Sequence, residues 1–467
     1  MKKTKIVCTI GPASSDLETA KKMIKAGMNV ARFNMSHGNH ESHGALVSII
    51  KKAREEMNAC VALMIDLKGP EIRIRQFENG KVVLKRGQKF VLTTQNVMGT
   101  QDYVSVNYSK FPKIVQKGAK ILLNDGLIEL KVLDTNSDSV LTGVVVGGEL
   151  SNNKSINLPG CKLEMDFLSE SDKRDIDFAK QIDADILSLS FVSSPKDVLD
   201  VKKYLAKIGF DNVKLVSKIE NSVGVENLEE IVKVSDGVMV ARGDMGVEIE
   251  YEKIPSIQKK IIKLCRKYGK VSITATQMLE SMITNPRPTR AEISDVANAC
   301  IDGSTCVMLS GETSAGAYPI ESISAMRKII EECEKEMIFP RDSCFEGNGN
   351  ICASIGFAAC DLAESLDAGS ILVVTKSGES AGNISRFRPR ATILACTPSK
   401  KAYYQMAYLW GVVPIMDKEF SSIDDLLNSS KQKCLETKLV KKGDLFVEVA
   451  GIKTGCSGID IVRVDRY

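Results

Sequence analysis

The sequence predicts an α/β protein: a (β/α)8 TIM barrel with an inserted small β-barrel domain and a C-terminal three-layer α/β domain. Three observations support this fold class. Short apolar strands alternate with helix-like segments over residues 5–309, which is the pattern of a (β/α)8 barrel. About 120 residues separate the third strand from the fourth, far more than a βα connection needs. A second series of strands and helices begins near Asn350.

The predicted barrel strands are continuous runs of Val, Ile and Leu, which is typical of parallel strands buried on both faces. Segments between them, including Leu17–Ala26, Glu41–Glu56 and Ile254–Tyr268, have helical periodicity. The barrel is therefore predicted to occupy residues 1–70 and 167–343. Its eight strands are Lys5–Ile10, Asn29–Phe33, Val61–Ile65, Asp185–Phe191, Lys214–Ile219, Gly237–Ala241, Val271–Thr276 and Cys306–Leu309.

The other two domains have different patterns. Over residues 71–166, strands such as Lys81–Leu84, Lys89–Thr93 and Val140–Gly148 are punctuated by Asn-Gly, Asp-Gly and Gly-Gly pairs, which favours antiparallel β-structure. Over residues 344–467, strands alternate with helices, which indicates a separate α/β domain. The strands expected there are Ile371–Thr375, Thr392–Cys396, Val412–Ile415, Leu445–Val449 and Ile459–Val464.

Composition excludes several function classes. The 467 residues carry a net charge of +4 without a basic stripe, so nucleic acid is not an expected partner. No apolar run approaches the ~18 residues of a membrane span, and no secretory signal is evident. The 13 cysteines are an odd number without a Cys-x-x-Cys pair, which indicates free thiols in a reducing compartment. We therefore expect a cytoplasmic protein.

Polar residues follow six of the eight predicted barrel strands. Active sites of such barrels lie at the C-terminal ends of the strands, so these side chains are expected to converge on one face. A single polar tip is as readily explained by a structural ion pair, but that reading does not suit the whole set. The six tips are Arg32–Ser36, Asp66–Gly69, Lys218–Asn221, Arg242–Asp244, Thr274–Gln277 and Ser310–Thr313.

Residue types at these tips predict chemistry on a phosphate. Glu220 and Asp244 end adjacent strands, and two carboxylates at one mouth suit a hard cation such as Mg²⁺. Gly243 lets the backbone approach a ligand closely. Lys218 points to the same side of its strand as Glu220, and a cation beside a metal stabilises charge on a moving phosphoryl group.

Further tip residues predict phosphate contacts and a second cation. Arg32 and Arg73 offer guanidinium donors that suit phosphate oxygens. Asn34, Ser36 and Asp66 offer oxygens for a monovalent cation. Because no His or Cys joins the set, zinc is not expected.

The sequence resembles pyruvate kinase along nearly its whole length. Several motifs in the right order make this resemblance specific. The matching segments are Thr4–Ser15, Ala31–Gly38, Lys68–Arg73, Lys218–Asn221, Met239–Asp244, Ala275–Met282, Asn285–Glu292 and Met308–Thr313.

The resemblance implies transfer of the phosphoryl group of phosphoenolpyruvate to ADP, giving pyruvate and ATP. It also implies Mg²⁺ (or Mn²⁺) and K⁺ as cofactors, a lid formed by the inserted domain, a regulatory C-terminal domain and a homotetramer. Closure of the lid would exclude water and favour transfer to ADP over hydrolysis.

Site roles also follow from the resemblance. Arg32 and Lys218 would contact the transferring phosphoryl group, and Thr276 would help to protonate the enolate. Arg73 and Asn34 would serve the nucleotide, and Glu71 matches the branch of the family that depends on a monovalent cation. The implied ligands are Glu220 and Asp244 for the divalent metal, Asn34, Ser36, Asp66 and the Leu67 carbonyl for K⁺, and the backbone of Ala241–Asp244, with Gly243, for the substrate carboxylate.

Several positions depart from the family pattern. Leu67 stands where Thr is usual, and a lost hydroxyl there could alter affinity for K⁺ or nucleotide. The other departures are Asp166, Ser171, Ser193, Val223 and Thr305. They suggest a divergent rate or cation preference. They also leave open a catalytically weak paralogue that senses a metabolite, and a Mg²⁺-dependent pyruvate or oxaloacetate lyase is a third alternative.

The stretch Thr375–Gly382 resembles the family's effector loop, with Thr375, Lys376, Ser377, Gly378 and Ser380 as candidate ligands of a phosphorylated effector. Small residues and backbone N–H groups ahead of a helix form an anion cradle. Glu379 adds a negative charge, while Gly382 and Tyr404 stand where Arg is frequent. We expect weakened binding of a sugar bisphosphate; the alternative is a purely structural turn.

Two remaining signals are interpreted as structural. The cluster His37, His40 and His43 is read as a helix start rather than a metal site, because no carboxylate second shell is evident. Trp410 is expected to pack within the third domain. Gly455–Gly458 are read either as part of an effector loop or as a turn.

Overall fold

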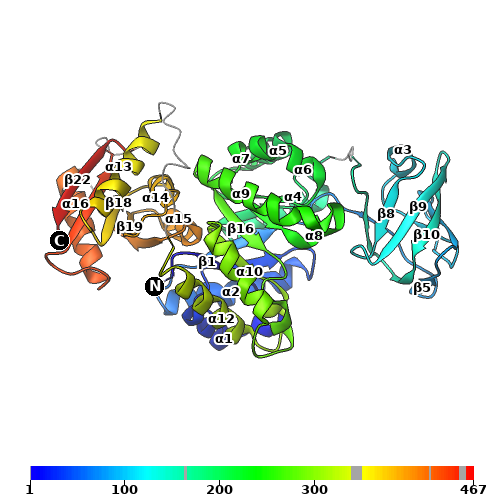
Figure 1. Cartoon of the computed structure of the whole chain (residues 1–467), viewed down its shortest axis with the longest axis horizontal. Coiled ribbons are helices and arrows are strands. Elements are labelled where there is room, and N and C mark those ends of the chain that lie inside the picture. The colour runs from blue at the N-terminus through cyan, green and yellow to red at the C-terminus, as the bar shows by residue number, and fades with distance from the viewer. Residues whose placement is uncertain (1, 162–165, 338–349, 420–421, 452–458) are drawn as a thin grey trace.

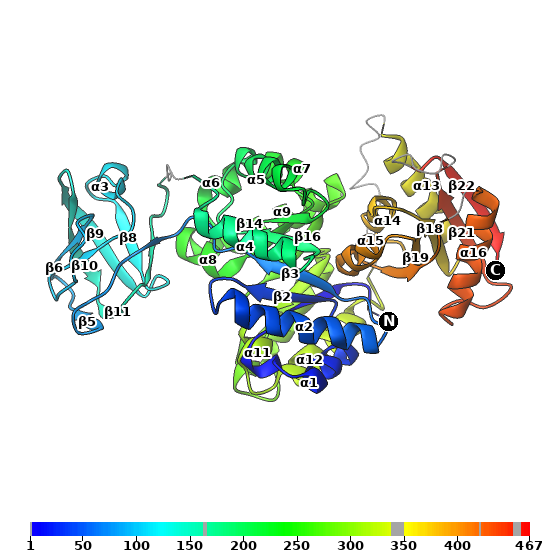
Figure 2. The same cartoon turned by 180° about the vertical axis from the view of Figure 1, so that it is seen from behind.

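A computed structural model of the chain describes residues 2–161, 166–337, 350–419, 422–451 and 459–467. Three units lie in a row, with the barrel between the inserted domain and the C-terminal domain (Figures 1 and 2). Among the described residues, no helix combines the length and apolar character needed to cross a bilayer. The predicted boundary between the barrel and the C-terminal domain, at residues 343 and 344, lies outside the described residues, as do Gly455–Gly458.

The first unit is a closed barrel of eight parallel strands in the order β1-β17-β16-β15-β14-β13-β3-β2, as the sequence predicts. The strands are β1 (Lys5–Thr9), β2 (Val30–Asn34), β3 (Ala62–Asp66), β13 (Ile186–Leu189), β14 (Lys214–Ile219), β15 (Gly237–Ala241), β16 (Val271–Ala275) and β17 (Cys306–Leu309). The elements around them are η1 (Pro12–Ser14), α1 (Leu17–Ala26), α2 (His40–Glu56), α4 (Glu170–Gln181), α5 (Pro195–Ile208), α6 (Ser222–Glu226), α7 (Leu228–Val234), α8 (Arg242–Glu248), η2 (Tyr251–Lys253), α9 (Ile254–Tyr268), η3 (Glu280–Ile283), α10 (Arg290–Ile301), α11 (Gly311–Ser314) and α12 (Pro319–Cys333).

Local signals in the sequence explain where barrel helices begin and end. The side chain of Asp16 accepts a hydrogen bond from the Thr19 backbone at the start of α1, as an N-cap residue does. A capping box of Thr289 and Glu292 starts α10. Gly269 ends α9 in the left-handed region, with φ of 66°, where glycine has no steric cost.

Strand ends differ slightly from the predicted limits, and the differences bear on the site. Strands β2 and β3 extend one residue further and include Asn34 and Asp66, which are register partners. The fourth strand was predicted to reach Phe191 but ends at Leu189, and Phe191 has a positive φ of 58°. A bulky residue in that conformation is uncommon and is held by its surroundings.

The inserted unit is a small β-barrel. Its seven-stranded sheet has the order β4-β12-β8-β9-β10-β6-β7, and an antiparallel bridge between Ile74 and Val106 joins its two edges beyond β4 and β7. Pairing is antiparallel as predicted, except that β6 and β7 are parallel. The elements are β4 (Ile72–Arg73), β5 (Lys81–Leu84), β6 (Lys89–Thr93), β7 (Tyr103–Ser105), α3 (Phe111–Ile114), β8 (Lys120–Leu123), β9 (Ile128–Thr135), β10 (Ser139–Val146), β11 (Gly148–Ser151), which pairs with β5, and β12 (Ser155–Asn157).

The C-terminal unit has three layers. Its sheet has the order β20-β19-β18-β21-β22, and only β22 is antiparallel to its neighbour. Helices α13 and α14 share a buried cluster with one face of the sheet, and α16 shares another with the opposite face. The elements are α13 (Ile351–Ser365), β18 (Ser370–Val374), α14 (Glu379–Ser385), β19 (Thr392–Thr397), α15 (Lys400–Gln405), η5 (Met406–Tyr408), β20 (Val412–Met416), α16 (Ile423–Glu436), β21 (Leu445–Ala450) and β22 (Ile461–Arg466).

Two aromatic residues of this unit face the barrel. The indole of Trp410 donates a hydrogen bond to Thr4 Oγ1 at 3.2 Å, and the guanidinium of Arg388 from its own domain lies 4.8 Å from the ring centroid, so Trp410 is buried where the third domain meets the barrel. Tyr404 is buried beneath the guanidinium of Arg54, 3.5 Å from its ring centroid. Both residues contact a domain that lies hundreds of positions away in the sequence, which local patterns do not reveal.

Candidate active site

The predicted site residues gather at the C-terminal ends of the barrel strands. Arg32 and Asn34 lie on β2, Asp66 on β3 and Lys218 on β14. Immediately after their strands come Glu220 (β14), Gly243 and Asp244 (β15) and Thr276 (β16). The parallel register places all of these ends at one mouth of the barrel.

A row of alternating charges crosses this mouth. The guanidinium of Arg32 donates from Nε to Asp66 Oδ2 at 2.7 Å. Lys218 Nζ lies 3.5 Å from Asp66 Oδ1 and 2.9 Å from Glu220 Oε1. All four side chains are buried, so each charge depends on its neighbours for stabilisation.

The row determines the protonation of its members. Burial favours neutral Lys218, but Asp66, Glu220 and Asp244 outweigh it and hold the pKa of Lys218 above its ordinary value. Burial also opposes charge on Asp66, yet Lys218 and Arg32 hold the pKa of Asp66 below its usual range. For Glu220 the balance is reversed: burial, with a contribution from Asp244, raises its pKa to about 7 against the effect of Lys218.

Two oxygens in this row fit a cation. Glu220 Oε2 accepts a hydrogen bond from the Phe191 backbone at 2.6 Å, whereas Glu220 Oε1 and Asp66 Oδ1 are buried and face Lys218 Nζ at 2.9 and 3.5 Å. An ionised carboxylate offers about four lone-pair sites, so both oxygens keep capacity for a further ligand beside the lysine. Asp244 is exposed beside Glu220, so its carboxylate is open to a ligand. The pair suits Mg²⁺, which binds through one or two carboxylates with waters and phosphate.

The residues predicted to hold a monovalent cation lie on neighbouring chain segments. Asn34 and Asp66 are paired across β2 and β3, and Asn34 Oδ1 accepts the backbone N–H of Ser36 at 3.1 Å. The carbonyl of Leu67 accepts a hydrogen bond from Ser190 Oγ at 2.8 Å and keeps a second lone pair. The oxygens expected around K⁺ thus come from the adjacent tips of β2 and β3.

Thr276 and Gly243 form a second polar feature beside the row. The Gly243 N–H donates to Thr276 Oγ1 at 2.8 Å, and that hydroxyl donates to the Ala275 carbonyl at 2.6 Å. Thr276 and Gln277 have positive φ values of 69° and 52°. Backbone strain of this kind is concentrated at functional sites.

Some polar tips have structural roles instead. Arg242 donates to the Thr276 carbonyl at 2.6 Å and pairs with Asp295 at 2.7 Å, so it supports the strained turn. Glu312 accepts hydrogen bonds from the backbones of Ser310 and Leu279 at 2.7 and 3.1 Å. Glu312 therefore ties the ends of β17 and β16 together rather than facing a ligand.

Sequence reasoning missed Ser190, which lies just beyond β13. Its hydroxyl accepts a hydrogen bond from Lys218 Nζ at 2.7 Å while donating to the Leu67 carbonyl. It therefore connects the lysine to the predicted K⁺ site. A signal was present in the sequence, since Ser188 and Ser190 are hydroxyls within an otherwise apolar run, but such residues also occur as ordinary strand residues.

The inserted domain contributes Arg73 at a distance from the row. Arg73 donates to Glu71 Oε2 at 2.8 Å and to the Asn153 carbonyl at 2.6 Å, and neither of these partners belongs to the row. A cavity of about 360 Å³ lies between the inserted domain and the barrel, and both Glu71 and Asp244 line it. Arg73 therefore stays a predicted nucleotide ligand, held beside this cavity by Glu71.

The candidate effector loop is closed mainly by its own contacts. Thr375 Oγ1 accepts the Gly378 N–H at 3.0 Å, and Lys376 pairs with Glu419 at 2.6 Å. Gly378 has a φ of 83°, and a Cβ there would lie 2.9 Å from Met406 Cγ, so glycine is required for the turn. The Thr375 hydroxyl is used for a hydrogen bond within the loop, which fits a structural turn. The roles of Ser377 and Ser380 as ligands stay predictions.

The histidine cluster does not converge on one point. His40 Nε2 lies 2.6 Å from Asp175 and the ring stacks on Phe178 at 4.9 Å. His43 Nε2 instead contacts the carbonyl of His37 at 2.7 Å. These contacts attach α2 to α4 and to the preceding loop.

Comparisons with known proteins identify the family. The family model described as the pyruvate kinase barrel domain matches residues 1–323, and that described as the pyruvate kinase alpha/beta domain matches residues 353–464. Pyruvate kinase of Clostridium acetobutylicum is 43% identical over 98% of both chains, and that of Staphylococcus haemolyticus is 44% identical over 98% of this chain and 79% of its own. A crystal structure of a pyruvate kinase from Cryptosporidium parvum superposes with a TM-score of 0.94 at 36% identity, covering 100% of this chain and 96% of that one. The chain belongs to the pyruvate kinase family.

Proposed function

We infer that this protein transfers the phosphoryl group of phosphoenolpyruvate to ADP, giving pyruvate and ATP. The observation that carries this inference is the buried row from Arg32 to Glu220, which ends beside exposed Asp244 at the barrel mouth. A row of this kind places fixed positive charges and carboxylate oxygens where a phosphoryl group and a metal must meet. Family membership gives the identity of the donor and acceptor.

We assign Glu220 and Asp244 to Mg²⁺ or Mn²⁺, and Asn34, Ser36, Asp66 and the Leu67 carbonyl to K⁺. A divalent metal held there would supply positive charge to phosphate oxygens. The buried oxygens Glu220 Oε1 and Asp66 Oδ1, which face Lys218 and keep further lone pairs, support these assignments. The carboxylate of Asp66 accepts a hydrogen bond from Arg32 and lies next to Lys218. It therefore holds these two positively charged side chains in place.

The chain's own residues then have distinct tasks. Arg32 and Lys218 donate to the transferring phosphoryl group and stabilise its charge. Backbone N–H groups around Gly243 and Asp244 at the start of α8 bind the substrate carboxylate. Thr276 Oγ1, held by Gly243 and Ala275, directs a proton to the enolate carbon.

The inserted domain is assigned the role of a lid. Arg73 binds the nucleotide phosphates from the lid side, and closure excludes water from the phosphoryl group. A lyase needs no nucleotide lid, and the intact charged row disfavours an inactive sensing paralogue. By analogy with the family we also propose a homotetramer in the cytoplasm.

The test is a coupled assay of pyruvate formation from phosphoenolpyruvate and ADP with Mg²⁺, with and without K⁺. Turnover that rises strongly with K⁺ supports both the reaction and the second cation site. Turnover without a K⁺ response keeps the reaction but removes Asn34, Ser36 and Asp66 from a cation role. No turnover by folded protein overturns the proposed reaction in favour of a sensing paralogue.

A further inference from the structure

The inserted domain is joined to the barrel by two chain segments, and both of them meet at one side chain. The first segment runs between β3 and β4, and the second runs between β12 and α4. Asp172, in the first turn of α4, is buried between them. Its Oδ1 accepts the Gly69 N–H of the first segment at 3.0 Å, and its Oδ2 accepts the Ser169 N–H and hydroxyl of the second at 3.1 and 2.6 Å. One carboxylate thus holds both connections of the domain.

Only part of this arrangement belongs to an ordinary helix start. Ser169 and Asp172 form the capping box of α4, in which Ser169 Oγ also accepts the Asp172 N–H at 3.0 Å. The hydrogen bond from Gly69 is not part of such a box. It requires an acceptor at the second oxygen, whereas an asparagine amide offers one acceptor oxygen and an NH2 group that cannot accept. The carboxylate at position 172 is therefore explained by the two connections together.

The first connection is tightly packed at Gly69. Its φ is 72°, and a Cβ there would lie 2.8 Å from the carbonyl oxygen of Ser190, so the position requires glycine. Ser190 is also the residue whose hydroxyl accepts a hydrogen bond from Lys218. The connection is therefore held from two sides, by Asp172 and by the residue that contacts the buried charged row.

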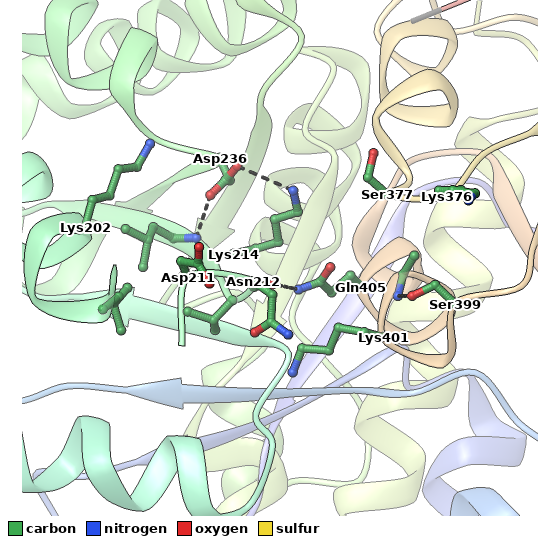
Figure 3. A pocket seen from close by; sticks show the side chains of 14 residues that line it. Lys202, Asp211, Asn212, Lys214, Asp236, Lys376, Ser377, Ser399, Lys401 and Gln405 are labelled. Carbon is green, nitrogen blue, oxygen red and sulfur yellow. Dashed lines mark hydrogen bonds and ion pairs between the residues drawn. The ribbon is translucent and has the colours of Figure 1, made fainter. Parts of the chain in front are cut away.

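The C-terminal domain is attached to the barrel in a different way. Gln405 of α15 donates to the Asn212 carbonyl at 2.7 Å (Figure 3). Lys401 of the same helix pairs with Asp183 at 2.6 Å, and Trp410 binds the first residues of the chain as described above. Because these contacts involve several separate segments of the barrel, they oppose rotation of the C-terminal domain.

Away from its connections, the inserted domain faces the barrel across the cavity of about 360 Å³. Helix α8 contacts it at the edge of this cavity. The Glu248 carboxylate accepts hydrogen bonds from the Asn157 side chain and the Leu158 backbone. Val247 lies close to the Gly126 turn, where a Cβ on the glycine would be 3.4 Å from Val247 Cγ1. A domain that is held at one edge and separated from the barrel by a cavity has room to turn about that edge.

We propose that Asp172 is the pivot of the inserted domain, a positioning residue that fixes both connections while the domain turns toward the barrel mouth. This inference rests on the proposed role of that domain as a lid. Hinges of moving domains are a few residues at the ends of elements, far from the chemistry. Arg73 lies on β4, which directly follows the first connection, so a fixed Gly69 returns Arg73 to the same place at each closure. A displaced lid would leave the phosphoryl group open to water.

Hydrogen exchange of the full chain without substrates, read at single residues by mass spectrometry, tests the pivot. The reporter is the Leu158 N–H, because its hydrogen bond to Glu248 joins the inserted domain to α8. Asp172→Asn should speed exchange at Gly69 and at Leu158 about tenfold or more, the scale of one hydrogen bond to a charged group. Exchange within β9 and β10 should not change, since the inserted domain has its own buried core. Faster exchange throughout that sheet would indicate unfolding, and unchanged exchange at Leu158 would reduce Asp172 to a helix cap; either result overturns the proposal.

Glu292→Gln is the matched control. Glu292 closes the capping box of α10 and also holds a second segment, since it accepts the Thr289 N–H and the Ser281 N–H, each at 2.7 Å. The change should speed exchange at the start of α10 and leave Leu158 unchanged. If Asp172→Asn does not fold, Ser169→Ala is a milder change that removes only the hydroxyl from Asp172. It should speed exchange at Leu158, and no effect there would contradict the pivot.

Activity adds a readout that loss of a helix cap would not move. In Asp172→Asn, kcat/KM for ADP should fall about tenfold if the closed lid is populated about tenfold less. The Kd of phosphoenolpyruvate measured without ADP should not change, because the residues assigned to that substrate lie on the barrel. Equal losses for both substrates would contradict a role through the lid. If the wild type shows no turnover, the proposed reaction fails, and the exchange of Leu158 still decides whether Asp172 is the pivot.

Discussion

Replacing Lys218 with methionine tests whether the charged row is one electrostatic unit. The change removes the cation 2.9 Å from Glu220 and 3.5 Å from Asp66, and both carboxylates are 1% exposed. Removing one partner of a buried ion pair costs about 3–5 kcal/mol. Two features limit the loss: Asp66 keeps Arg32, and Glu220 takes up a proton readily because its pKa is already about 7. We therefore expect the free energy of unfolding to fall by about 3 kcal/mol, the low end of that range.

Urea unfolding at pH 7 measures this loss, and Mg²⁺ extends the test. A divalent cation replaces the missing positive charge beside Glu220, so Mg²⁺ should stabilise Lys218→Met more than the wild type. In the coupled assay, kcat should fall about 10²–10³-fold, the usual effect of removing one donor to a charged transition state. Lys233→Met is the control: Lys233 pairs with Glu230 at 2.6 Å on the surface, and its loss should cost less than about 1 kcal/mol.

Two results would refute this reasoning. If Lys218→Met unfolds at the same urea concentration as the wild type, the two carboxylates do not depend on Lys218 for their burial. If kcat falls less than about tenfold, the lost stabilisation is below about 1.4 kcal/mol, and Lys218 does not contact the phosphoryl group during transfer.

Three further changes test other parts of the site. Thr276→Val removes the acceptor of the Gly243 N–H and should lower kcat about 10²-fold or more with little change in KM, as loss of proton transfer does; an unchanged kcat excludes the proton role. Arg73→Met should raise KM for ADP and leave KM for phosphoenolpyruvate unchanged, and equal effects on both would contradict a nucleotide role. Calorimetric titration with fructose bisphosphate should show weak binding that Glu379→Arg strengthens; tight binding by the wild type would reject the predicted weakening.

The barrel could be predicted because all of its strands share one environment and therefore one sequence pattern. Each strand is buried on both faces, so it appears as an unbroken apolar run, and the closed order of eight strands follows. The site was predictable to the same extent, because polar residues that end such runs must lie at one mouth. Even the pairing of Asn34 with Asp66 follows from their positions at adjacent strand ends.

What could not be predicted depends on side-chain direction and on contacts between domains. Ser190 is chemically indistinguishable in the sequence from Ser188, yet only Ser190 bonds Lys218. The strained conformation of Phe191 brings its N–H to Glu220, and no local propensity favours it. Trp410 was expected to be buried in the third domain, but its hydrogen bond to Thr4 of the barrel could not be foreseen, because a residue's tendency to be buried does not show which domains cover it.

The charges of the site predict that a bound cation favours binding of an anionic substrate. Arg32 and Lys218 face three carboxylates, those of Asp66, Glu220 and Asp244, so the mouth carries an excess of one negative charge while Glu220 is ionised. An anionic substrate is repelled by such a site. One divalent cation reverses the sign, and it also stabilises ionised Glu220, which burial disfavours. We therefore expect activity to depend on a cation, because the protein supplies fewer positive charges at this mouth than its own carboxylates and substrate require.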